Sequence, residues 1–249
     1  MTARVTHRRI SRWFAPTLPI LALACLSVTP ASAAPAARST CTGGAIAPGT
    51  YLGLTVVGSC TIPSGTVVVR GGLVVTRASA LWSLSGATLA VSGGVTLQAN
   101  SSFITSSARV DGAIQADNPT FLLIGSSTLG GAVRVVGGIE IDIRSSTLNG
   151  GFSQEQMGSP SNTTVAQSVV RGGISVTNGG IRGGVSLLLN RISGGARIVN
   201  IRSRNDMSST IAGNTIAGNL VCSGNEPAPT NGGVQNTVSG QTIGQCAGF

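Results

Sequence analysis

The chain has 249 residues and a formal net charge of +9, and 41% of its residues are hydrophobic while 9% are charged. This balance excludes an intrinsically disordered protein, because disorder requires few apolar and many charged residues, and the lack of a Gly-X-Y period excludes collagen. All 16 basic residues are arginine, and the length suits one domain or two small ones.

The segment 1–33 has the pattern of a secretory signal peptide. A basic stretch at 4–12 precedes an apolar run at 14–28, and Ala31-Ser32-Ala33 supplies the small residues of a cleavage site. The apolar run is too short and too interrupted by proline to predict a membrane span. We therefore expect a secreted protein, with a signal peptide at 1–33 and a mature chain that starts at Ala34.

Two other export signals stay open at this end of the chain. Arg8-Arg9 is the core of a twin-arginine signal, although Ile10-Ser11 lacks the apolar residue that such signals prefer next. Leu23-Ala24-Cys25 is similar to a lipoprotein cleavage site, and cleavage there would leave a lipid anchor on Cys25.

Removal of the signal peptide changes which chemistry is available. His7 is the single histidine, so the mature chain has no Ser-His-Asp or Cys-His nucleophile and no histidine-based zinc site. We expect no metal and no cofactor. An even number of cysteines in an exported chain predicts two disulfides, and the cysteines that remain are Cys41, Cys60, Cys222 and Cys246.

Internal repetition is the main structural signal of the mature chain. Its pattern is Ser/Asn, any residue, apolar, any residue, Gly, Gly/Asn, apolar. Four copies begin at Ser146, Ser168, Asn190 and Asn214, with offsets of 22, 22 and 24 along the chain. Weaker copies, with offsets of 22, 18 and 19, are Gly71-Gly72-Leu73, Gly93-Gly94-Val95, Asp111-Gly112-Ala113 and Gly130-Gly131-Ala132.

A period of about 20 residues without a helical pattern predicts an all-β, single-domain parallel β-helix with coils of about 18–24 residues. We assign 34–40 to a short linker and 41–249 to this domain. The Ser and Asn residues that begin the four copies would lie on one line and satisfy backbone groups at a corner. The glycine pairs are interpreted as positive-φ corners. The apolar residues expected inside are Leu148, Val170, Ile192 and Ile216.

On this repeat pattern, most of 41–249 resembles the right-handed parallel β-helix proteins of the pectin-lyase-like superfamily. The chain is also similar to secreted β-solenoid proteins of high-GC bacteria, with which its lysine-free composition agrees. Segments 65–75 and 86–97 resemble the filament-forming bactofilins, but the signal peptide and the cysteines argue against that assignment. The resemblance implies a fold and no particular activity.

Glu140 and Asp142 are the candidates for catalysis. We expect the isoleucines of 139–143 to point inward and both acids outward, with Cα atoms about 7 Å apart on one face. A glycosidase with paired carboxylates uses such a spacing, and Arg134 and Arg144 are near in sequence.

One coil after this acid pair, the chain offers Asn162 and Thr164 in place of a third acid. A solvated acidic pair on an outer strand is therefore favoured over a catalytic pair.

The last coils are rich in arginine and poor in acids, which suggests a surface for an anionic partner such as a cell-envelope polymer or a surface glycan. Solubility of an otherwise uncharged surface explains these residues about as well. Aromatic residues are not interleaved with them, so we expect no nucleic acid as partner. The six arginines are Arg171, Arg182, Arg191, Arg197, Arg202 and Arg204.

The cysteine spacings predict the disulfide pairing. The offset from Cys41 to Cys60 is 19 and that from Cys222 to Cys246 is 24, so each approximates one coil. Residues one coil apart are expected to lie above one another at about 4.8 Å, within the Cα distance of a disulfide. We therefore predict Cys41–Cys60 and Cys222–Cys246 as caps of the two ends.

Three functions are compatible with these features. The favoured one is an exported, non-catalytic β-solenoid with a structural or surface-interaction role. The second is a carbohydrate-active enzyme, a polysaccharide lyase or glycoside hydrolase, that uses Glu140 and Asp142. The third is a protein that binds an anionic envelope polymer through the six arginines.

Overall fold

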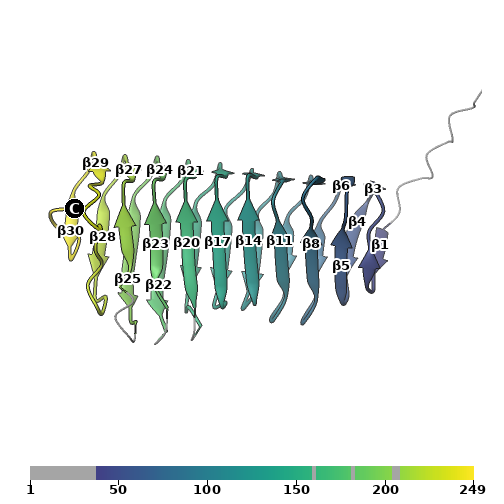
Figure 1. The fold of residues 1–249 in the computed structure, drawn as a ribbon, viewed down its shortest axis with the longest axis horizontal. Helices are drawn as coiled ribbons and strands as arrows, with labels where there is room; N and C mark the ends of the chain where they lie inside the picture. Colours follow the sequence, from purple (N-terminus) through teal and green to yellow (C-terminus); the bar gives the residue numbers. More distant parts are fainter. Residues whose placement is uncertain (1–37, 159–160, 181–182, 204–207) are drawn as a thin grey trace, which may run out of the picture. The chain divides into compact units, whose positions relative to one another are not determined.

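The computed structural model describes residues 38–158, 161–180, 183–203 and 208–249. Over these residues the chain is all-β, without helix, and forms a parallel β-solenoid of about nine turns (Figure 1). The predicted parallel β-helix fold is therefore confirmed. No helix in this part of the chain has the length and apolar character to cross a membrane. The predicted signal peptide at 1–33 lies outside the described residues.

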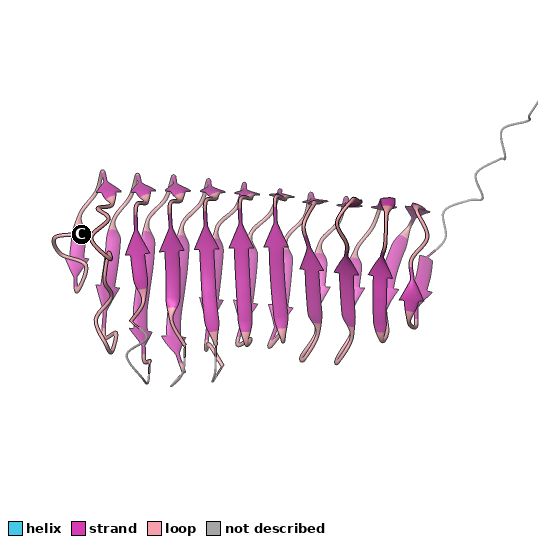
Figure 2. Cartoon of the chain, in the orientation of Figure 1, coloured by secondary structure: helices cyan, strands magenta, loops and turns pink. Residues whose placement is uncertain are grey.

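Each complete turn contributes one strand to each of three parallel sheets, which we name A, B and C (Figure 2). Within the described residues, sheet A consists of β1 (Arg38–Cys41), β4 (Gly53–Val56), β7 (Leu73–Val75), β10 (Val95–Leu97), β13 (Ile114–Asp117), β16 (Val133–Val136), β19 (Phe152–Glu155), β22 (Ile174–Gly179), β25 (Ala196–Ile201), β28 (Leu220–Ser223) and β30 (Thr242–Gly244). Sheet B consists of β2 (Gly44–Ala45), β5 (Ser59–Ile62), β8 (Ala80–Ser83), β11 (Ser102–Thr105), β14 (Phe121–Gly125), β17 (Glu140–Arg144), β20 (Asn162–Ala166), β23 (Val185–Leu188) and β26 (Thr210–Ala212). Sheet C consists of β3 (Gly49–Tyr51), β6 (Gly65–Val69), β9 (Ala87–Val91), β12 (Ala108–Val110), β15 (Thr128–Leu129), β18 (Thr147–Leu148), β21 (Val169–Val170), β24 (Arg191–Ile192), β27 (Thr215–Ile216) and β29 (Thr237–Val238).

The strand register defines the length of each turn. Ala196 pairs with Leu220, an offset of 24, whereas Arg38 pairs with Gly53, an offset of only 15. The first turn is thus shorter than any coil that the repeat pattern predicted, and its sheet B strand β2 spans only two residues. The linker prediction is also wrong at its end, since residues 38–40 belong to β1.

The interior contains columns of apolar side chains, one residue per turn. Residues of β18, β21, β24 and β27 that pair in register form one such column, as predicted. Burial of each side chain of this size contributes about 1.5–3 kcal/mol, and each column couples a turn to its neighbours. The members of this column, all at most 1% exposed, are Leu148, Val170, Ile192 and Ile216.

A line of buried Ser and Asn side chains supports the corner between sheets B and C, as predicted. The backbone N–H of Ser168 donates to Oδ1 of Asn190 at 3.0 Å, and the N–H of Asn190 donates to Oδ1 of Asn214 at 2.9 Å. The line continues to Ser127 and Asn236, which the repeat pattern did not identify. These side chains satisfy backbone donors at the corner, so that neighbouring turns are joined by more than the sheets.

The glycine pairs stand at the corner between sheets C and A, and the predicted reason for them is wrong. None of Gly150-Gly151, Gly172-Gly173 and Gly194-Gly195 has a positive φ. Glycine is needed because adjacent turns approach closely: a Cβ on Gly172 would lie 2.7 Å from the backbone N of Gly151. Gly112 stacks on Gly93, where Asp111 was expected, and Gly131 stacks on Gly112. The last two weaker copies therefore begin one residue later than predicted.

Two disulfides close the ends of the solenoid with the predicted pairing. Cys41 bonds to Cys60, and Cys222 bonds to Cys246, with Cα–Cα distances of 6.4 and 5.3 Å. The sequence predicted that the two cysteines of each bond lie above one another in register, and this is wrong for the first bond. Cys41 lies in β1 of sheet A and Cys60 in β5 of sheet B, so this bond crosses between two sheets of successive turns.

Candidate functional sites on the outer faces

Glu140 and Asp142 lie on the outer face of sheet B, in β17. Ile141 between them is buried, as predicted. Ile139, predicted to lie inside, is 45% exposed. The reason is that the alternation of β17 starts only at Glu140, after the corner that precedes the strand.

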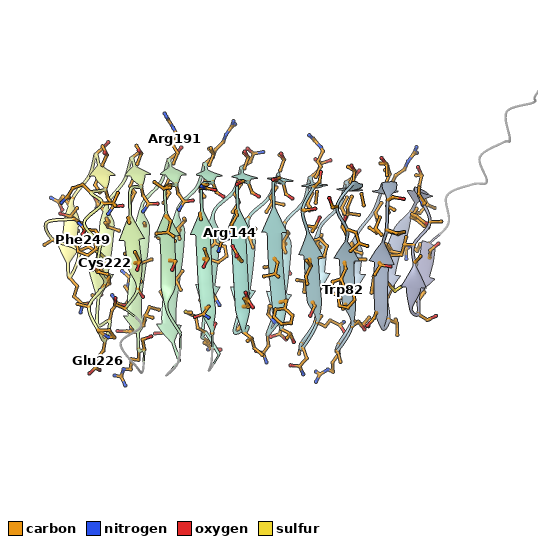
Figure 3. All side chains as sticks on the ribbon, viewed as in Figure 1. Trp82, Arg144, Arg191, Cys222, Glu226 and Phe249 are labelled. Atoms are coloured by element: carbon orange, nitrogen blue, oxygen red, sulfur yellow. A yellow bond between two sulfur atoms is a disulfide. The ribbon has the colours of Figure 1, made fainter. Side chains whose placement is uncertain are left out.

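The carboxylate of Asp142 is engaged by a neighbouring arginine. Nε of Arg144 donates to Oδ1 at 2.7 Å and to Oδ2 at 2.8 Å, and both side chains are partly exposed. Figure 3 labels Arg144. This hydrogen bond, together with the negative charge of Asp142, raises the pKa of Arg144 above its ordinary value. Both carboxylate oxygens of Asp142 are thus engaged by an arginine. Arg134, by contrast, lies in β16 of sheet A, on a different face.

The acid pair lines a small cavity of about 240 Å³. In register, Glu140 lies beside Asn162 and Asp142 beside Thr164, so the next turn places an amide and a hydroxyl where a third acid would stand. Nowhere in the described ranges do three His, Cys, Asp or Glu side chains gather to hold a metal ion. The cavity can accept hydrogen bonds from a small polar group, and its two carboxylates come from the same face of one strand.

Of the six predicted arginines, the four that the structure describes do not form one patch. Three of them lie near the edge between sheets C and A: Arg171, Arg191 and Arg197. Figure 3 shows Arg191 pointing away from this edge, and Glu226 at the opposite side of the solenoid. Arg202 follows the far end of β25, where its backbone forms an isolated parallel β-bridge with that of Glu226. The other two, Arg182 and Arg204, lie outside the described residues.

A shallow groove of about 530 Å³, here named the sheet A groove, lies beside the glycine corner. Glycines of successive turns line it, and these are Gly151, Gly173 and Gly195. Ser153, Ser175 and Arg197 also line it, and they occupy the same outward position of β19, β22 and β25. The groove therefore runs along the stack of turns rather than across one of them.

Arg134 pairs in register with Ser153, so it continues the same line of outward residues on β16. We name the line Arg134–Ser153–Ser175–Arg197 the sheet A column. The sequence interpretation missed it, although a signal exists. Each member stands two residues after the last small residue of its corner, as in Gly151-Phe152-Ser153 and Gly195-Ala196-Arg197.

No family model, no curated protein and no solved structure matches the chain. The class that the fold defines is the parallel β-solenoid, and no match supports the resemblance to the pectin-lyase-like superfamily or to proteins of high-GC bacteria.

Proposed function

We propose that this protein is an exported, non-catalytic β-solenoid that serves as a rigid structural or surface-interaction element outside the cell. The observation that carries this proposal is the continuous stack of turns. All three sheets join successive turns, apolar columns fill the interior, and a disulfide closes each end. Such a stack presents long, regular outer faces whose residues repeat at one position per turn.

Export is supported by two independent features of the chain. The segment 1–33 has the charged, apolar and Ala-x-Ala parts of a signal peptide. Both disulfides require an oxidising compartment to persist. By its repeat pattern we place the protein beside the secreted pectin-lyase-like β-helix proteins of high-GC bacteria.

The surroundings of the acid pair favour a non-catalytic role over a glycosidase. Glycoside hydrolysis needs two carboxylates that flank one bond, with one of them free to attack the sugar or to activate water. Here both oxygens of Asp142 accept hydrogen bonds from Arg144. Glu140 is flanked in register by Phe121 and Asn162, and neither residue supplies a second acid.

Activity assays on a panel of polysaccharides test the non-catalytic role. We expect neither new reducing ends nor unsaturated products from the purified protein. Asp111→Asn is the matched control for the acid pair, because Asp111 is also an outward carboxylate paired with an arginine, at 2.9 Å from Arg109. Turnover that disappears in Glu140→Gln or Asp142→Asn but persists in Asp111→Asn would establish the enzyme instead.

N-terminal sequencing of the exported protein tests the processing step. We expect a mature chain that starts at Ala34, because Ala31 and Ala33 supply the residues that signal peptidase requires. A lipidated start at Cys25 would place the protein on the membrane surface and contradict its release.

A further inference from the structure

We propose that the outer face of sheet B is the contact surface of a symmetric dimer, in which two copies of the chain pack side by side with their solenoid axes parallel and pointing the same way. The inference goes beyond the proposed role, because it names a surface and the partner that covers it. It depends neither on export nor on the absence of catalysis.

An apolar patch lies on the N-terminal half of this face. Trp82, Ile104 and Leu123 are outward residues of β8, β11 and β14 that pair in register from turn to turn. Trp82 is 39% exposed, and Figure 3 labels it on this face. Leu84 and Phe121 flank this column on its two sides. A contiguous exposed apolar patch marks a contact surface, whereas isolated exposed apolar residues do not.

The charges of the three sheets favour a second copy as the partner. In the part of the chain that the structure describes, the strands of sheets A and C carry five arginines and two carboxylates, whereas those of sheet B carry one arginine and two carboxylates. Two copies repel each other through sheets A and C, so sheet B is the face on which they meet at the lowest electrostatic cost. An anionic lipid surface would instead be attracted to the faces that carry the arginines.

The order of charges on β17 indicates how the copies face each other. Glu140, Asp142 and Arg144 are outward residues at the start, middle and end of this strand. A two-fold axis along the solenoid reverses the strand direction at the same height, so Glu140 of one copy faces the partner's Arg144. A two-fold axis along the strands, centred on sheet B, would place the charges of β17 on β11, whose outward residue Ile104 is apolar. Parallel solenoid axes therefore bring opposite charges together.

The ion pair within each copy is compatible with this contact. Arg144 uses Nε to bind both oxygens of Asp142, which leaves its two terminal nitrogens to donate to the partner's Glu140. Asp142 faces its own copy near the two-fold axis, and its charge is already neutralised by Arg144.

The area of the face is sufficient for a dimer. Figure 1 shows the strands of sheet B side by side along the solenoid. Nine strands spaced by about 4.8 Å, with an average length of about 13 Å, cover about 560 Å². Two such faces bury about 1,100 Å², slightly more than the total of about 1,000 Å² that a specific interface requires. The apolar patch covers three of the nine strands, so the contact must run along the whole sheet, as it does when the axes are parallel.

Tryptophan fluorescence at increasing protein concentration tests the inference, with the disulfide-intact protein after removal of the signal peptide. Trp82 is the single tryptophan beyond residue 33, so the emission reports on this face alone. Sedimentation equilibrium should show a dimer with a dissociation constant in the micromolar range. As the dimer forms, we expect the emission of Trp82 to move to shorter wavelength and its quenching by acrylamide to fall. Neutral and anionic phospholipid vesicles are the probes for a lipid partner.

A charge placed in the patch identifies the surface. Ile104→Arg should weaken the dimer at least about tenfold, because two like charges then meet at the centre of the contact. Val74→Arg is the matched control, because Val74 is a half-buried outward residue of β7 in sheet A, between Thr55 and Thr96 in register. This control should leave the dissociation constant unchanged. Circular dichroism shows whether both variants keep the fold.

Exchange of the charges on β17 tests the arrangement without a change in the patch. Glu140→Arg and Arg144→Glu should each weaken the dimer about two- to fivefold, because each brings like charges together across the contact. The double variant should regain the affinity of the parent protein, because each new charge again faces an opposite one.

Several outcomes would overturn the inference. They are a monomer at every concentration, a dimer in which Trp82 is quenched as readily as in the monomer, an equal loss in Val74→Arg and Ile104→Arg, and a double variant as weak as the single variants. A shift of the emission with vesicles but not with protein concentration would assign the face to a lipid surface instead. These outcomes leave the non-catalytic role intact, and cleavage of a polysaccharide would contradict that role without affecting the dimer.

Discussion

Replacing Asn214 by alanine tests the polar line that joins sheets B and C. Asn214 is 1% exposed, and its side chain makes four hydrogen bonds. Its Oδ1 accepts from the backbone N and from Nδ2 of Asn190, at 2.9 and 3.0 Å. Its Nδ2 donates to the carbonyl oxygen of Leu187 at 2.8 Å and to Oδ1 of Asn236 at 2.9 Å. One side chain thus satisfies two backbone groups of the preceding turn.

The contacts determine the expected magnitude. Alanine leaves the backbone N–H of Asn190 without a partner and removes the second hydrogen bond of the Leu187 carbonyl, which keeps its place in the pairing of β23 with β26. Loss of the partner of a buried donor destabilises by about 1–3 kcal/mol, and loss of the second bond adds to this. We therefore expect the free energy of unfolding to fall by about 3 kcal/mol. Serine should lose about half as much. Ser168 occupies the same position of the line two turns earlier, and its Oγ accepts a hydrogen bond from the backbone N–H of Ser146 at 3.1 Å. A serine at 214 should therefore keep the bond from the N–H of Asn190 but lose the bond to the carbonyl of Leu187, which the longer amide makes.

Urea unfolding with intact disulfides measures the loss, and amide hydrogen exchange at Asn190 locates it. Exchange of this amide should be fastest in Asn214→Ala, intermediate in Asn214→Ser and slowest in the parent protein. Thr215→Ala is the control, because Thr215 is the next residue and is exposed, and we expect a change below about 0.5 kcal/mol. A loss below about 1 kcal/mol in Asn214→Ala, or an equal loss in Asn214→Ser, would refute the role of these side-chain bonds.

Two further predictions concern the corner and the end cap. Gly172→Ala should destabilise the protein by about 1–3 kcal/mol, because its Cβ would meet the backbone of Gly151. Urea unfolding measures this loss, and Ser193→Ala is the control because Ser193 is an exposed turn residue. Equal unfolding midpoints of the two variants would contradict the prediction. Removal of the second disulfide by Cys222→Ser and Cys246→Ser should destabilise the C-terminal end by about 3 kcal/mol. Hydrogen exchange should then rise in the last turns and stay unchanged in the middle turns, and a uniform rise would contradict a local cap.

Spacing in the sequence is sufficient to predict the fold class and two of its internal features. In a solenoid each turn contacts its neighbours through the same positions, so a constant offset along the chain becomes adjacency in space. For this reason an offset of 22 along the chain places Val170 beside Ile192 and Ser168 beside Asn190. The cysteine pairing is also predictable from spacing, because cysteines about one coil apart lie on successive turns, although Cys41 and Cys60 lie on different sheets of those turns.

Only the tertiary structure decided how each turn divides into three faces. Arg134 and Glu140 are six residues apart yet lie on sheets A and B, whereas Arg134 and Arg197, far apart in the chain, share one column. The division depends on corners, where Gly172 fits against the backbone of Gly151 and Gln167 adopts a left-handed conformation with φ of 52°. Because the strands between corners are two to six residues long, a corner misplaced by one residue moves a side chain from the interior to the surface. Repetition along the chain therefore predicts which residues are neighbours, and the backbone packing at the corners determines which face those neighbours share.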